Sequence, residues 1–138
     1  MRSHLPILFL IFWGGWLSAE PLRIKKEDSI VILGNTFAER MQLFGYFEVF
    51  LHSRFPDHNL RVRNMGWSAD EVHQRSRPQG FPKLSAELKE HRADLLFLCF
   101  GFNESFQGAT GLDHNKAELG NFLEELQGQK FNVESAPR

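Results

Sequence analysis

The stretch that most constrains the fold is Ile30–Leu33, four consecutive β-favouring aliphatic residues that end at Gly34. An uninterrupted aliphatic run is typical of a strand covered on both faces, as in a parallel sheet. Gly34 permits a sharp turn, and Asn35 and Thr36 are residue types that cap helices. We therefore expect a strand, a tight turn and a helix. The polar atoms of the turn should lie at the carboxyl end of the strand, where open α/β sheets bind ligands.

The alternation of strand and helix continues along the chain. Apolar residues at helical spacing after the turn predict one long helix that packs against a large surface. Later segments show either the strand period or the helix period, and Gly128 closes the last helix. The order βαβαβα predicts a parallel sheet with right-handed crossovers. The expected elements are helix 37–54, a half-exposed strand 60–64 near a sheet edge, helix 83–91, a fully buried strand 93–100 and helix 115–127.

Composition limits the classes of protein to consider. The 138 residues, of which 42% are hydrophobic and 13% aromatic, suffice for one ordinary core. A net charge of −1, from 16 basic and 17 acidic residues, argues against nucleic acid or an anionic membrane surface as a partner. Cys99 is the single cysteine, so no disulfide framework is possible. Because Cys99 lies in an apolar run, we expect a small buried hydrophobe.

Residues 1–19 have the pattern of a targeting segment. Arg2 precedes the apolar run Leu5–Leu17, and Ala19 offers a small residue for cleavage before Glu20. We interpret this segment as a secretory signal peptide, which predicts a secreted or periplasmic protein without a stable membrane span after cleavage. The alternative is an uncleaved amphipathic or membrane-anchoring segment, although the run is shorter than the ~20 residues of a spanning helix.

Three predicted strands end in polar loops that contain a glycine. In a parallel sheet these loops emerge on one side, so their polar groups should meet. Together they offer a hydroxyl at a helix start, backbone N–H groups at glycine turns and a side-chain amide. Such groups can hold the charge that develops on a tetrahedral intermediate. The residues concerned are Gly34, Asn35 and Thr36 in the first loop, Asn64 and Gly66 in the second, and Gly101 and Asn103 in the third.

The three loops resemble, in order and spacing, the first three sequence blocks of the SGNH (GDSL-type) hydrolases. The resemblance spans about residues 29–127 and implies a three-layer α/β/α fold with a parallel sheet and flavodoxin-like topology, incomplete at the C-terminus. Residues 20–138 would then form the N-terminal part of an SGNH-hydrolase-like domain. The blocks are Gly34-Asn35-Thr36, Asn64-Met65-Gly66-Trp67-Ser68 and Gly101-Phe102-Asn103-Glu104.

The resemblance also implies roles for individual residues. Thr36 stands at the position of the nucleophilic serine, and Gly66 and Asn103 stand at the positions of the oxyanion donors. Asn35 replaces the family's aspartate, and the methyl group of Thr36 crowds the turn and restricts its χ1. The block Asp-x-x-His that carries the family's general base has no counterpart before Arg138. We expect further binding contacts from Asn35, Asn64, Trp67 and Glu104.

No other catalytic or cofactor motif is evident. His73 follows the Gly66 loop and is the one histidine expected near the strand ends, either as a base or as an exposed loop residue. Trp67 either lines a pocket for an acyl or sugar group or packs over its loop. No metal-ligand spacing and no glycine-rich phosphate loop occurs, so the sequence predicts neither a metal nor a cofactor.

These features leave three functional hypotheses. The first is an exported SGNH-like ester hydrolase that acts on a small-molecule or carbohydrate ester, with poor activity in these 138 residues because a base is missing. The second is a non-catalytic relative that binds a carbohydrate or protein in the same cleft. The third is a truncated reading frame without stable function.

Overall fold

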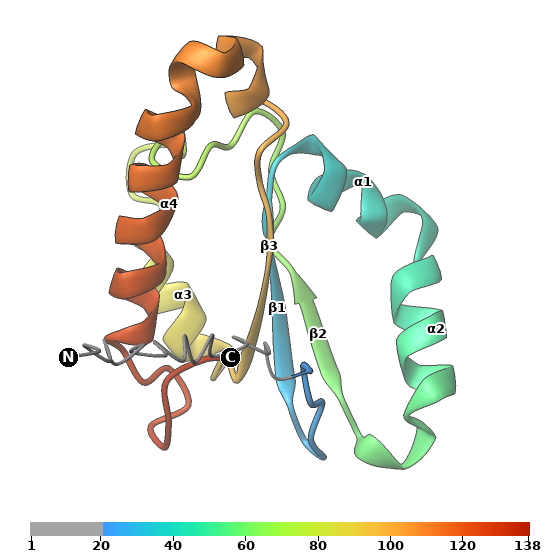
Figure 1. Ribbon diagram of the computed structural model, residues 1–138. Helices are drawn as coiled ribbons and strands as arrows, with labels where there is room; N and C mark the ends of the chain where they lie inside the picture. Colours follow the sequence, from blue (N-terminus) through green and yellow to red (C-terminus); the bar gives the residue numbers. More distant parts are fainter. Residues whose placement is uncertain (1–20) are drawn as a thin grey trace, which may run out of the picture.

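The computed structural model describes residues 21–138, so the predicted signal peptide lies outside the described residues. These residues form strands and helices in alternation, an α/β fold (Figure 1). The elements are β1 (Ser29–Gly34), α1 (Thr36–Phe44), α2 (Tyr46–Arg54), the short 3-10 helix η1 (Pro56–His58), β2 (Arg61–Asn64), α3 (Leu84–Glu90), β3 (Leu95–Cys99), the 3-10 segment η2 (Glu104–Gly111) and α4 (Leu112–Gln127).

The sheet has three parallel strands in the order β2-β1-β3, so β1 is central. Ile30 of β1 lies opposite Val62 of β2 and Leu95 of β3. Helices α1 and α2 cover one face of the sheet, and α3 and α4 cover the other (Figure 1). The predicted three-layer arrangement, with a central aliphatic strand and β2 at an edge, is thus confirmed.

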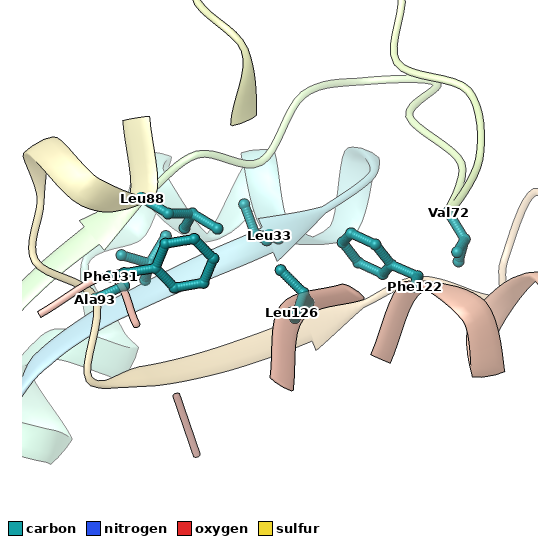
Figure 2. Packing of buried hydrophobic residues seen from close by; sticks show 8 residues of the cluster. Leu33, Val72, Leu88, Ala93, Phe122, Leu126 and Phe131 are labelled. Carbon is teal, nitrogen blue, oxygen red and sulfur yellow. The ribbon is translucent and has the colours of Figure 1, made fainter. Parts of the chain in front are cut away.

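Alternating side chains of β1 supply two separate cores. Val31 and Leu33 face α3 and α4, while Ile30 faces α2. Figure 2 shows side chains from the sheet and both helices converging on Leu33. All residues of β1 are buried, as expected for a strand covered on both faces. The larger core comprises Val31, Leu33, Val72, Leu88, Ala93, Phe122, Leu126 and Phe131.

The single helix predicted over residues 37–54 is wrong, because the chain forms two helices that meet at Gly45. Gly45 adopts the left-handed conformation (φ 62°), and its N–H donates to the carbonyl of Met41 at 3.3 Å. The change of direction turns most of the expected apolar face toward solvent, so that Leu51 is buried on α2 while several large side chains are exposed. The large side chains more than 60% exposed on α1 and α2 are Phe37, Leu43, Phe44, Tyr46, Val49 and Phe50.

Strand β3 is less buried than the sequence predicts. Leu95 is buried, whereas the residues from Leu96 to Cys99 are partly exposed because β3 is an edge strand. At its start, the N–H of Leu96 donates to the carbonyl of Arg138 at 2.8 Å, and the N–H of Arg138 donates to the carbonyl of Asp94 at 3.0 Å. This pair of bonds is the pattern of a parallel strand. Among the described residues, Arg138 therefore bonds to the start of β3 in the manner of a parallel strand, while the sheet itself has three strands.

Other sequence predictions hold with shifted ends. Helix α4 begins at Leu112, three positions before the predicted start, and its C-terminal cap is Gly128. Phe122 and Leu126 are buried, but Leu119 and Leu123 are exposed. Within residues 21–138, the structure contains no helix with both the length and the apolar character needed to cross a membrane.

Candidate active site

The turn after β1 places Asn35 and Thr36 at the carboxyl end of the central strand. The Asn35 side chain accepts a hydrogen bond from the N–H of Phe37 at 3.2 Å and thereby caps α1. An added Cβ at Gly34 would lie 2.4 Å from the carbonyl oxygen of Cys99, so only glycine lets β1 and β3 approach this closely. The side-chain nitrogen of Asn35 is buried and has no partner among the described residues.

The Thr36 hydroxyl belongs to a chain of hydrogen bonds that ends on a carboxylate. Thr36 Oγ1 donates to Ser68 Oγ at 3.3 Å, and Ser68 Oγ donates to the Glu39 carboxylate. Glu39 lies three residues after Thr36 on α1, on the same helix face. The carboxylate can therefore take up a proton from Thr36 through the Ser68 hydroxyl.

Sequence reasoning did not identify Ser68 and Glu39 as functional residues. The signal for Glu39 was its spacing from Thr36, since positions i and i+3 are neighbours on a helix surface. No sequence pattern specified Ser68, because the position of its hydroxyl depends on how the loop after β2 folds over α1.

Gly66 packs directly against the start of α1. An added Cβ would lie 2.5 Å from the backbone nitrogen of Glu39, so the loop after β2 needs glycine at this point. Asn64 fixes the same contact, since its Nδ2 donates to the Ala38 carbonyl at 2.7 Å and its Oδ1 accepts from the Gly66 N–H at 2.8 Å. The N–H that the resemblance assigns to the oxyanion hole is therefore engaged by Asn64.

The loop after β3 is tied to the loop after β2. Asn103 Nδ2 donates to the carbonyl of Asp70 at 3.4 Å, a long hydrogen bond that leaves this amide weakly held. The buried Glu104 carboxylate accepts from the N–H groups of Val72 at 3.1 Å and of Gly101 at 2.9 Å. Glu104 therefore joins the loops after β2 and β3. The side-chain amide of Asn103, held by one long hydrogen bond, is the donor in this loop that could bind a ligand oxygen.

An apolar cavity of about 640 Å³ opens beside Asn35 and Thr36. Its walls combine the first turn of α1 with the end of β3, and one cation, Arg40, stands among them. Burial raises the pKa of the Cys99 thiol, which also lines the cavity, so at neutral pH this sulfur is a thiol and not a thiolate. The remaining lining residues are Phe37, Leu98, Phe100 and Phe102.

Trp67 and His73, two further residues considered for the site from the sequence, contact side chains other than Thr36, Ser68 and Glu39. Trp67 is 44% exposed, and the Arg77 guanidinium lies 4.6 Å from the centre of its ring. His73 is close to Glu118 at 3.3 Å and Glu71 at 3.7 Å. The structure thus joins Thr36 with Ser68 and Glu39, and it joins His73 with two carboxylates outside that chain of hydrogen bonds.

Within residues 21–138, no three His, Cys, Asp or Glu side chains gather in a way that could hold a metal ion. The side chains that the structure places at the strand ends offer a hydroxyl, a carboxylate and an amide donor.

Comparison with known proteins identifies the fold alone. No protein-family model matches the chain, and no curated protein matches it significantly. Among solved structures, the chain is similar to BT4096, described as a gut microbial diltiazem-metabolizing enzyme, with a TM-score of 0.54 and 18% sequence identity. The match covers 84% of this chain and 26% of that one, so the chain spans about a quarter of its structural neighbour.

Proposed function

We propose that this chain belongs to an exported ester hydrolase related to the SGNH (GDSL-type) hydrolases, with Thr36 as the nucleophile. The observation that carries the proposal is the hydrogen-bonded chain Thr36–Ser68–Glu39 at the carboxyl end of β1. A hydroxyl becomes a useful nucleophile when a base can take its proton. The neighbouring apolar cavity fits the acyl group of an ester, and the structural neighbour is a drug-metabolizing enzyme.

The proposed reaction passes through an acyl-enzyme. Thr36 Oγ1 attacks the ester carbonyl carbon while its proton moves to Ser68 and the Ser68 proton moves to Glu39. Collapse of the tetrahedral intermediate breaks the bond to the alcohol, which leaves with the proton from Glu39 by the reverse route. Water then attacks the acyl-threonine ester with Glu39 as the base, and this step releases the carboxylic acid.

The oxyanion in this reaction needs hydrogen-bond donors. Asn103 Nδ2 is the first candidate, because its bond to the Asp70 carbonyl is long and easily exchanged. The Gly66 N–H can contribute only if it leaves Asn64. We therefore expect slow turnover, since one donor is weakly held, the other is occupied, and a carboxylate is a weaker base than imidazole.

The second candidate function is a non-catalytic module that binds a carbohydrate or protein in the same cleft. The engaged Gly66 N–H favours it, because an oxyanion donor that is already satisfied gains little from the transition state. The Thr36 methyl group also restricts attack at this turn.

Hydrolysis of an aryl acetate by the purified 138-residue chain distinguishes the two functions. For an esterase, we expect a slow rate above the uncatalysed reaction that falls to background in Thr36→Ala and in Glu39→Gln. Glu48→Gln, at an exposed carboxylate of α2, is the matched control and should keep the parent rate. A rate unaffected by Thr36→Ala contradicts the esterase and favours the binding module.

Export is a separate part of the proposal and rests on the apolar segment Leu5–Leu17 followed by Ala19. The secreted protein should begin at Glu20, which N-terminal sequencing can establish. A mature N-terminus upstream of Leu17 would contradict cleavage at this site.

A further inference from the structure

A second cavity lies between the end of β1, the loop after β2 and the start of α3. Its volume is about 240 Å³, and Leu33 and Gly34 of β1 form part of its wall. It differs from the cavity beside Thr36 in its charged lining. Three cationic side chains, Arg75, Arg77 and Lys83, face two acidic ones, Asp70 and Glu87.

Of the two guanidinium groups in this cavity, Arg77 forms an ion pair with a carboxylate of the described residues and Arg75 does not. Asp70 is buried, and its two oxygens accept from the two terminal nitrogens of Arg77 at 2.7 and 2.6 Å. This bidentate pair raises the pKa of Arg77 through the hydrogen bonds to Asp70. The Asp70 carboxylate therefore accepts its hydrogen bonds from Arg77 and acts on the second guanidinium, Arg75, only through its charge.

Arg75 is the guanidinium left without such a partner. Its terminal nitrogen donates to the Val72 carbonyl at 2.9 Å, and its planar group lies 4.5 Å from the centre of the Phe122 ring. Its Nε is buried and has no hydrogen-bond partner among residues 21–138, and no carboxylate in that part of the chain lies within ion-pair distance. Burial also lowers the pKa of Arg75, as expected for a cation removed from water without full compensation.

We propose that this cavity binds a small monovalent carboxylate with an apolar body, held by the Arg75 guanidinium and Lys83. Three cationic and two acidic side chains leave one positive charge, which a monoanion neutralises and a phosphate dianion exceeds. A guanidinium binds the planar carboxylate group through paired N–H donors. The apolar side chains of Met65, Leu84 and Phe100 in the same wall suit a hydrocarbon body.

Butyrate is a suitable probe, and butyramide is its neutral counterpart of the same shape. In isothermal titration of the 138-residue chain, we expect saturable binding of butyrate, and binding of butyramide and inorganic phosphate at least about tenfold weaker. Arg75→Met keeps an unbranched apolar stem but removes the guanidinium, its charge and its contact with the Phe122 ring. This substitution should weaken butyrate binding about tenfold or more.

Further variants keep the test decisive if Arg75→Met does not fold. Lys83→Gln changes an exposed side chain and should weaken butyrate binding, whereas Lys89→Gln, an exposed lysine of α3 that does not line the cavity, should not. Thr36→Ala should bind butyrate as the parent does, which separates this site from the proposed esterase. Equal binding of butyramide, tighter binding of phosphate, or unchanged affinity in both Arg75→Met and Lys83→Gln would overturn the proposal.

Discussion

The carboxylate of Glu104 accepts a hydrogen bond from the N–H of Val72, a residue 32 positions earlier in the chain. Its second oxygen accepts from the N–H of Gly101, so one buried side chain holds the loops that follow β2 and β3 in a fixed relation. Asn103, the candidate oxyanion donor, directly precedes it. The position of the Asn103 amide therefore depends on Glu104.

Glu104→Ala should lower the free energy of unfolding by about 2 to 6 kcal/mol, because two backbone donors lose their acceptor and each costs about 1 to 3 kcal/mol. Glu104→Gln should cost less, since its remaining carbonyl oxygen can serve one donor. Ser105→Ala, at the exposed neighbouring position, is the control. Denaturant unfolding at constant m-value gives the comparison, and equal stability of parent and Glu104→Ala would contradict a structural role.

Glu104 illustrates how far the sequence predicts the site. The order of the three polar loops and their place after parallel strands could be predicted from the aliphatic runs and the glycines. The partners of each side chain could not, because they depend on how loops of irregular conformation cross. Ser68 meets Glu39 in this way, and Arg75 lies in the irregular segment between β2 and α3, where the sequence predicted no binding site.

The same limit applies to the fold. The buried central strand was predictable from its four consecutive aliphatic residues, Ile30–Leu33, whereas the break at Gly45 was masked by a helical pattern that continues on both sides. Helical periodicity identifies an apolar face but does not show whether a large surface exists to cover it. The exposed side chains of α1 and α2 are the result.

Gly66→Ala tests the contact between the loop after β2 and α1. An added methyl group would lie 2.5 Å from the Glu39 nitrogen, and overpacking of this kind costs about 1 to 3 kcal/mol or more. Gly120→Ala is the matched control, because nothing lies within 4 Å of the added carbon and alanine favours the helix by up to about 1 kcal/mol. The melting temperature should therefore fall in Gly66→Ala and rise in Gly120→Ala, and a shift of both in the same direction would contradict the proposed role of the contact at Gly66.

Thr36→Ser by itself should not convert the chain into an efficient esterase. Serine removes a methyl group but leaves the same Ser68–Glu39 connection and the same occupied Gly66 N–H. We expect a change in aryl-acetate turnover below about tenfold, against the factor of about 100 or more that one oxyanion donor contributes. A much larger increase would show that the methyl group, and not the base or the donors, limits the reaction.

Glu87→Gln should stabilise the protein at neutral pH and have little effect in acid. Burial raises the pKa of Glu87, with Arg77 opposing the shift, so the folded state binds this proton more tightly than the unfolded chain does. The stability that the proton contributes is present below the ordinary carboxyl pKa and is lost as the pH rises through the raised value. Thermal melts between pH 3 and about pH 7 should show the variant's advantage grow with pH, and Glu124→Gln, at an exposed site on α4, should show none.

The 138-residue chain should self-associate through the exposed side chains of α1 and α2. Leu43 and Phe50 are each 73% exposed, and solvent-facing apolar groups of this size in one region are typical of surfaces that another molecule covers. The edge of β3 beyond its contact with Arg138 presents backbone N–H and C=O groups that are unpaired within residues 21–138 and can also pair with another chain. Size-exclusion chromatography should show concentration-dependent association that Leu43→Glu with Phe50→Glu reduces. Val133→Glu, at a residue 78% exposed outside these helices, should leave it unchanged, and a monodisperse parent monomer with a cooperative melt would contradict the prediction.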